Sequence, residues 1–152
     1  MTMTRAEAQD PDVPRPAARY RVALRHGDQV FVAGMTPREG DHLLAVGRVG
    51  TEIDVGTARE LAGVAAARSL AAAASCRVAG ERLVPLSMTV YVSTVDPTIA
   101  ISEVADGASD RLVEATGSLP VRAAVAVAGL PGGAPVEVSL VVGVVPEGGA
   151  RG

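Results

Sequence analysis

The sequence predicts a single α+β domain in which two helices cover one face of a largely antiparallel sheet. The first observation is size and composition: the chain has 152 residues and 48% of them are hydrophobic, which suits one domain with its own core. The second is the order of the expected elements, because strands and helices do not alternate strictly along the chain. The third is an aromatic content of only 2%, which leaves Val, Ala and Leu to build the core. Since small side chains bury little area each, we expect additional burial through self-association.

The first half of the chain predicts a tail, a hairpin and a connecting segment. Residues 1–16 are expected to form a flexible N-terminal tail, followed by a domain over residues 17–146 and a C-terminal tail over residues 147–152. Alternating apolar and polar residues over 19–34 predict a β-hairpin, in which Gly27 of the His-Gly-Asp turn can adopt a positive φ. Residues 37–42 predict a turn, and 43–50 are either a short strand or an ordered loop.

An alanine-rich stretch over 57–76 predicts the first helix, because alanine has the highest helix propensity. Its small-residue face includes Leu61, Ala65, Ala72 and Cys76, and such a face can pack closely on a sheet. Cys76 is interpreted as a small buried hydrophobic residue.

The second half predicts one strand, one helix and two final strands. The strand covers 82–95, where apolar and polar residues alternate. The helix is expected to begin with Asp96 as its N-cap and Pro97 at the first helical position, and to end at Gly117. The two final strands, joined by the segment LPGGAP at 130–135, are expected to pair with each other in an antiparallel manner.

Two charged residues, Arg122 and Glu137, interrupt these otherwise apolar final strands. Because side chains alternate between the two faces of a strand, the residues Val136, Val138, Leu140 and Val142 form one apolar face. On the expected pairing, Arg122 and Glu137 share the other face, which does not meet the helices. They form either a cross-strand ion pair or two solvated charges, or they form an anion pocket. In a pocket, the arginine would bind a carboxylate bidentately and the glutamate would position or deprotonate a water.

Charge and composition exclude several classes of function. The net charge is −3, with 14 arginines, no lysine and no basic run, so a nucleic-acid partner is disfavoured. The absence of lysine excludes Schiff-base catalysis and a P-loop. The histidines, His26 and His42, and the single Cys76 do not form a metal-binding pattern, and we expect no metal. The sequence contains no signal-peptide pattern and no apolar run of about 20 residues, so we expect a cytoplasmic protein without a membrane span.

Four segments resemble consecutive motifs of the RidA/YjgF family, also called endoribonuclease L-PSP. They are RVALRHGDQVFVAGMTP at 21–37, VGRVGTEI at 46–53, VADGASDRLVEATG at 104–117 and VRAAVAVAGLPGGAPVEVSLVVGVV at 121–145. The last block is the most specific, and two of the segments are more similar to a divergent branch of the family. The resemblance implies a chorismate-mutase-like fold and a homotrimer, in which three sheets surround a central barrel and three clefts lie between subunits.

The resemblance also implies an activity: hydrolytic deamination of reactive enamine or imine intermediates of small 2-amino acids to 2-oxo acids and ammonia, without a cofactor. Arg122 matches the family arginine that binds the substrate carboxylate, and Glu137 matches the glutamate that orients the attacking water. The backbone of Ala124 matches a position that hydrogen-bonds the substrate, and Tyr20 matches a tyrosine that closes the pocket. Ala33 occupies a pocket position where the family usually has serine, and Arg19-Tyr20-Arg21 replaces the usual Pro-Tyr-Ser.

Two alternative functions remain open from the sequence. The first is a non-catalytic trimer that binds a small carboxylate metabolite. The second is the RNA cleavage in the family's other name, which the acidic charge and the absence of lysine and of an aromatic stacking platform disfavour.

Overall fold

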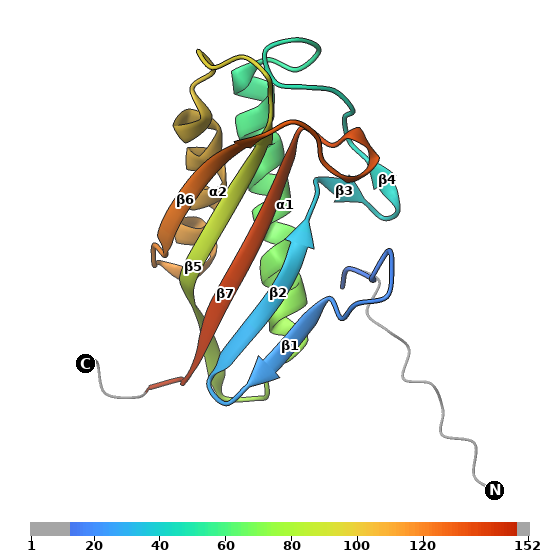
Figure 1. Ribbon diagram of the computed structural model, residues 1–152. Coiled ribbons are helices and arrows are strands. Elements are labelled where there is room, and N and C mark those ends of the chain that lie inside the picture. The colour runs from blue at the N-terminus through green and yellow to red at the C-terminus, as the bar shows by residue number, and fades with distance from the viewer. Residues whose placement is uncertain (1–12, 149–152) are drawn as a thin grey trace, which may run out of the picture.

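The computed structural model describes residues 13–148, in which both helices lie against one face of a five-stranded sheet (Figure 1). This arrangement confirms the α+β prediction. The strand order is β1-β2-β7-β5-β6, and β3 and β4 form a separate two-stranded ribbon. The bounds are β1 Ala23–His26, β2 Gln29–Met35, β3 Arg38–Glu39, β4 His42–Leu43, α1 Val55–Ala74, β5 Glu81–Ser93, α2 Ile101–Thr116, β6 Val121–Val127 and β7 Val136–Pro146, with a short 3-10 turn at Pro131–Gly133.

The predicted tails lie mainly outside the described residues, which exclude 1–12 and 149–152. Within the described part, Pro14 is buried. No helix in residues 13–148 combines the length and the apolar character needed to cross a membrane.

The predicted N-terminal hairpin is confirmed, with β1 paired to β2 and Gly27 at a φ of 62° in the turn. The segment predicted as a turn is a second small hairpin, because β3 and β4 pair around Gly40. Helix α1 begins after Asp54, whose Oδ1 accepts a hydrogen bond from the Thr57 backbone N–H at 2.7 Å. That contact satisfies one of the free N–H groups at the helix start.

Helix α2 begins later than the sequence predicts. Asp96 does not cap it: the Asp96 Oδ1 accepts hydrogen bonds from the Thr98 backbone N–H at 2.8 Å and from the Thr98 hydroxyl at 2.6 Å. This local turn competes with helix formation, and the helix starts at Ile101 instead. Its end is as predicted, because Gly117 is in the left-handed conformation with a φ of 77°.

The expected antiparallel pairing of the two last strands is wrong. β6 pairs with β5 in parallel, and β7 lies on the other side of β5, between β5 and β2. The reason is that β5, α2 and β6 form a β-α-β unit, whose helix crosses over the sheet and returns the chain parallel to β5. The connection at 128–135 then passes over the end of β5 to reach β7 (Figure 1).

The core lies between the sheet and the two helices. The face of β7 that was predicted to be apolar is buried there: Val136, Val138 and Val142 are fully buried and Leu140 is 2% exposed. Alanines of α1 face them, so the helix approaches the sheet closely. The helices also approach each other closely, because Gly63 of α1 and Gly107 of α2 meet where they cross.

An ion pair joins the edge strand β1 to the start of β5. The Arg25 guanidinium on β1 binds Glu81 bidentately, with Nη1–Oε1 at 2.7 Å and Nη2–Oε2 at 2.8 Å. Nη1 also donates to the Cys76 carbonyl at 3.2 Å, and the Val78 N–H donates to Glu81 Oε1 at 2.9 Å. The guanidinium and this N–H together lower the pKa of Glu81 from 4.5 to about 2.

This ion pair makes stability depend on pH. A carboxyl whose pKa is lowered by folding stabilises the protein above its ordinary pKa of 4.5, and this contribution is lost as the pH falls toward about 2. We therefore expect Glu81→Gln to lower the melting temperature at pH 7 and to differ progressively less from wild type below pH 4.5. Thermal unfolding of both proteins between pH 7 and pH 2 measures this, and a difference that is constant with pH would contradict it.

Candidate functional site

Glu137 lies near the start of β7, on the sheet face that points away from the helices. It pairs with Tyr91 of β5, and its neighbours Val136 and Val138 point into the core. The carboxyl group lies directly over Gly34 of β2, because a Cβ atom placed on Gly34 would be 2.7 Å from the Glu137 Cδ. Gly34 thus leaves the space that the carboxyl group occupies.

The environment of Glu137 suits proton transfer. Its side chain is partly buried, and burial raises the pKa of the carboxyl above its usual value because the charged form loses hydration. Within residues 13–148 no ion pair or side-chain hydrogen bond occupies its oxygens. An unpaired carboxylate with a raised pKa can accept a proton from a bound water and return it later.

Arg122 points toward α2, on the face of the sheet that meets the helices. It pairs with Met88 of β5, which in turn pairs with Leu140 of β7, and both of these side chains are buried in the core. The guanidinium lies at the rim of this core, with 24% of the side chain exposed, and pairs with Asp106 of α2 at 2.8 Å.

The structure therefore does not bring Arg122 and Glu137 together within one chain, and the prediction that they share a face is wrong. β5 separates their strands, and the two side chains point to opposite faces. Two strand spacings alone place the backbones about 10 Å apart. The sequence pattern misled because the valines of β6, rather than its alanines, were assigned to the core. Ala124 lies on the face of Arg122 and packs against the core, whereas Ala123 and the valines lie on the outer face.

Each of the other predicted site residues lies near either Arg122 or Glu137. Ala124 lies beside Arg122 on β6, an edge strand that leaves one row of backbone N–H and C=O groups unpaired in the sheet. Ala33 precedes Gly34 on β2, and its N–H donates to the Val22 carbonyl at 2.8 Å. This hydrogen bond aligns the segment that carries Tyr20 with the end of β2. Tyr20 is 47% exposed.

Sequence reasoning missed the partners of Arg122. Ser102, Asp106 and Ser109 are spaced four and three residues apart on α2, so they form a polar stripe on one helix face. That spacing is visible in the sequence, but the direction of the stripe depends on the placement of β6. Gly34 was missed as well, because its role depends on the close approach of β2 to β7.

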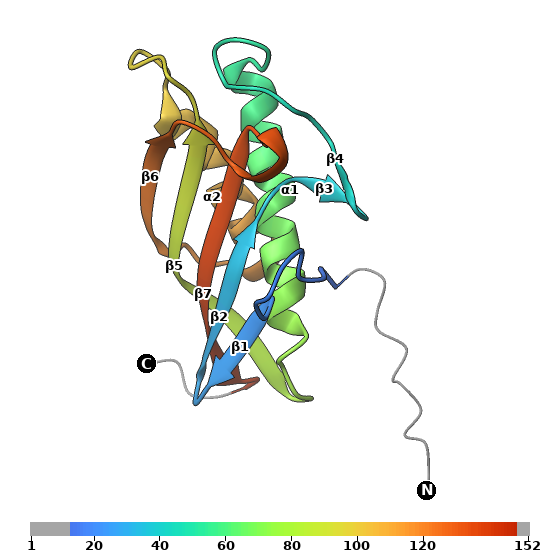
Figure 2. The ribbon, with the colours of Figure 1, turned by 45° about the vertical axis from the view of Figure 1, so that its right-hand side comes forward.

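The outer face of the sheet carries exposed apolar side chains. Viewed from the side, both helices lie on one side of the sheet, and no other described element covers the opposite side (Figure 2). The large apolar residues on that face that are more than a third exposed are Leu24, Phe31, Leu86, Val121 and Val125. Several large apolar side chains exposed on one sheet face are typical of a surface that another subunit covers.

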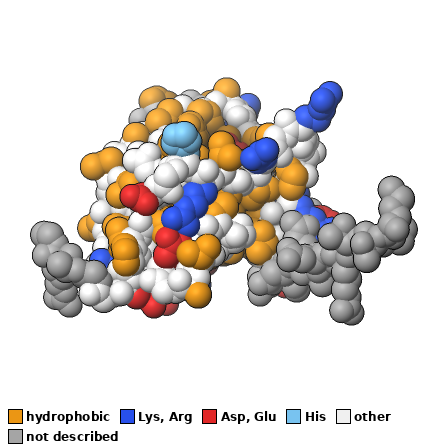
Figure 3. Space-filling model, turned by 90° about the horizontal axis from the view of Figure 1, so that it is seen from below, with side chains coloured by type: hydrophobic (Ala, Val, Ile, Leu, Met, Phe, Trp, Pro, Cys, Tyr) orange, Lys and Arg blue, Asp and Glu red, His pale blue; other side chains and the backbone are white. Residues whose placement is uncertain are grey.

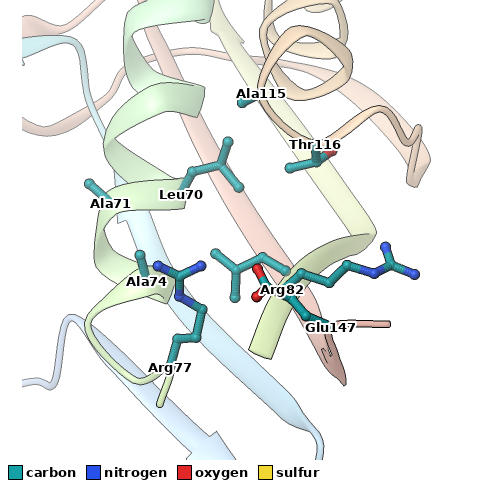
Figure 4. Close-up of a pocket in the computed structure, with 9 residues that line it drawn as sticks. Leu70, Ala71, Ala74, Arg77, Arg82, Ala115, Thr116 and Glu147 are labelled. Carbon is teal, nitrogen blue, oxygen red and sulfur yellow. The ribbon is translucent and has the colours of Figure 1, made fainter. Parts of the chain in front are cut away.

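A cavity lies at the other end of β7 from Glu137. It has a volume of about 460 Å³ between the ends of α1 and α2 and the start of β5, with Leu70, Arg77, Arg82 and Glu147 among its lining residues (Figure 4). None of the predicted site residues lines it. Viewed from this end of the molecule, positive and negative side chains are interspersed among apolar ones (Figure 3). Among residues 13–148, no group of three or more His, Cys, Asp or Glu side chains is arranged to hold a metal ion.

A methyl group at Gly34 tests the position of the carboxyl. We expect Gly34→Ala to displace Glu137 and to reduce any activity that depends on it at least tenfold, because the new Cβ and the carboxyl group cannot occupy the same space. The free energy of unfolding should change by less than about 1.5 kcal/mol, since the glutamate side chain can rotate away. Urea unfolding and activity measured on the same preparation check both expectations, and full activity in the folded variant would refute this geometry.

Comparison with solved structures shows the same fold in many bacterial proteins. Atu1372 from Agrobacterium tumefaciens, described as of unknown function, is 29% identical with a TM-score of 0.76, over 85% of this chain and 84% of that one. TdcF from E. coli, solved with bound serine, is 18% identical with a TM-score of 0.64, over 89% and 95%. The YjgF gene product of E. coli is 17% identical with a TM-score of 0.59, over 88% and 94%. A search of curated proteins found no match.

The family model described as endoribonuclease L-PSP matches residues 11–144, which is most of the chain. This match agrees with the shared fold of YjgF and with the motifs in the sequence. The chain therefore belongs to the endoribonuclease L-PSP family, also called the RidA/YjgF family.

Proposed function

We propose that this protein hydrolyses enamine or imine intermediates of small 2-amino acids to 2-oxo acids and ammonia, at sites between the subunits of a homotrimer. The observation that carries the proposal is the Glu137 carboxyl group: it is partly buried, has a raised pKa and is unpaired among the described residues. These are the properties of a group that positions a water and takes its proton. A protein of the same fold, TdcF, binds serine, so this fold accommodates a small amino acid.

The chemistry combines proton transfers with the addition of one water and the loss of ammonia. An enamine becomes the imine when its terminal carbon takes a proton and its nitrogen loses one. Glu137 takes a proton from water as the water oxygen bonds to the imine carbon, and the imine nitrogen is protonated. The amino group of the tetrahedral intermediate then takes a second proton and the C–N bond breaks to release ammonia, while the hydroxyl group loses its proton and its oxygen forms the carbonyl of the 2-oxo acid. The overall change adds one water and releases one ammonia.

A trimer would complete the site. Arg122 and Glu137 are too far apart within one chain to hold one small molecule, and they lie on opposite faces. The exposed apolar face and the unpaired edge of β6 are the surfaces available to a neighbouring copy. In the proposed assembly, Arg122 of one subunit binds the substrate carboxylate next to Glu137 of another subunit.

The direct test is to generate 2-aminoacrylate in situ and to follow pyruvate formation with and without the protein. We expect wild type to accelerate pyruvate formation, and Glu137→Gln to return the rate to the uncatalysed value. If wild type binds pyruvate without accelerating its formation, the protein is a carboxylate-binding trimer instead. An RNA-cleavage assay with Arg122→Ala as the control tests the activity in the family name, which a chain of net charge −3 without lysine is not expected to show.

A further inference from the structure

Arg122 is held by three side chains of one helix. Nη1 donates to Asp106 Oδ1 at 2.8 Å and to the Ser109 hydroxyl at 3.0 Å, and Nη2 donates to the Ser102 hydroxyl at 3.0 Å. All three acceptors come from consecutive turns of α2, so the helix presents them as a rigid unit. We call Ser102, Asp106 and Ser109 the α2 clamp.

The clamp leaves one side of the guanidinium free. Arginine has five N–H groups, and the α2 clamp uses both on Nη1 and one on Nη2. Within the described part of the chain, the Nε–H and the second N–H of Nη2 have no partner. Two N–H groups are what a carboxylate needs for bidentate binding. The α2 clamp thus fixes the orientation in which Arg122 presents these two N–H groups to a ligand.

The α2 clamp also offsets the positive charge of Arg122 that a ligand would experience, because one of its members is a carboxylate. Asp106 forms an ion pair with Nη1 at 2.8 Å, and its side chain is 47% exposed, so its carboxylate stays within a few ångströms of any anion that binds the guanidinium. Repulsion between this carboxylate and the ligand grows in proportion to the ligand's charge. A monocarboxylate can still bind through two hydrogen bonds. A dicarboxylate of the same size meets twice the repulsion, which offsets the additional attraction that its second charge has for Arg122.

We propose that Asp106 is a specificity-determining residue, which orients Arg122 and selects singly charged small 2-oxo or 2-imino acids over doubly charged ones. This inference rests on the proposed function, because it assumes that Arg122 binds the substrate carboxylate. Asp106 acts through Arg122 and takes no part in the proton transfers.

The experiment compares the affinity of the full-length protein for pyruvate, with one charge, and for oxalate, with two, by isothermal titration calorimetry. Asp106→Asn keeps an acceptor oxygen for Arg122 but removes the charge. We expect it to bind pyruvate about tenfold more tightly, equivalent to about 1.4 kcal/mol, and oxalate up to about a hundredfold more tightly. Asp110→Asn is the matched control: Asp110 is on the same helix and pairs with Arg59, so this variant should leave both affinities unchanged.

The outcomes separate this inference from the proposed function. If Arg122→Ala abolishes pyruvate binding but Asp106→Asn leaves the ratio of the two affinities unchanged, the role of Asp106 is refuted and the carboxylate site stands. If Asp106→Asn weakens the binding of pyruvate and of oxalate equally in a folded protein, Asp106 is only a structural support and the inference also fails. If Arg122→Ala binds pyruvate as wild type does, the proposed site and this inference fail together.

Discussion

Replacement of Arg122 by alanine is expected to weaken pyruvate binding about a hundredfold, because it removes charge-assisted hydrogen bonds worth about 3 kcal/mol. The affinity of Arg122→Lys for pyruvate should lie between those of wild type and Arg122→Ala. Lysine keeps the positive charge but lacks the planar guanidinium that binds a carboxylate bidentately and fits the α2 clamp. Titration calorimetry on the three proteins gives this ranking.

The stability of the Arg122 variants decides between a binding and a structural role. The ion pair is with Asp106, which is 47% exposed and becomes solvated when the arginine is removed. We therefore expect Arg122→Ala to lower the free energy of unfolding by about 1 kcal/mol or less. A loss of several kcal/mol with pyruvate affinity retained would show that Arg122 holds β6 to α2 and binds no ligand.

A methyl group at Gly107 is expected to destabilise the protein by about 3 kcal/mol, the largest change in stability that we predict. The Cβ atom would overlap the carbonyl oxygen of Arg59 and lie 2.7 Å from its carbonyl carbon. Because both belong to the backbone of α1, the two helices would have to move apart. Urea unfolding of Gly107→Ala measures the loss.

Gly63→Ala is the matched control at the same helix crossing. Its Cβ would lie 3.3 Å from the Gly107 carbonyl oxygen, a tight contact that a small shift relieves. Alanine also gains about 1 kcal/mol of helix propensity over glycine, so this variant should remain within about 1 kcal/mol of wild type. Equal effects of the two substitutions would mean that the crossing is not as close as the structure indicates.

Local signals made much of this fold predictable. The hairpin around Gly27, the alanine-rich α1 and the left-handed end of α2 at Gly117 each depend on the conformational preferences of a few consecutive residues. The buried face of β7 follows from a strict alternation of large apolar residues. None of these predictions needs knowledge of which strands are neighbours.

The candidate site was only partly predictable because it depends on strand order. Arg122 and Glu137 are each on the strand that the sequence indicates, but their common face was inferred from an adjacency that β5 interrupts. Small residues on β6 carried little information about which face is buried, because Ala124 packs against the core while Val121 is 72% exposed. The partnership of Arg122 with Asp106 follows only from that three-dimensional arrangement.

The central claim, that one site takes Arg122 from one subunit and Glu137 from another, is tested most directly by mixing two inactive variants. Arg122→Ala and Glu137→Gln are co-expressed with different tags, and assemblies that carry both tags are assayed for deamination of 2-aminoacrylate. In a trimer that contains both variants, one of the three sites pairs an intact arginine with an intact glutamate, so these assemblies should recover about a third of the wild-type activity. Mixed assemblies of trimer mass that remain as inactive as either variant alone would contradict it.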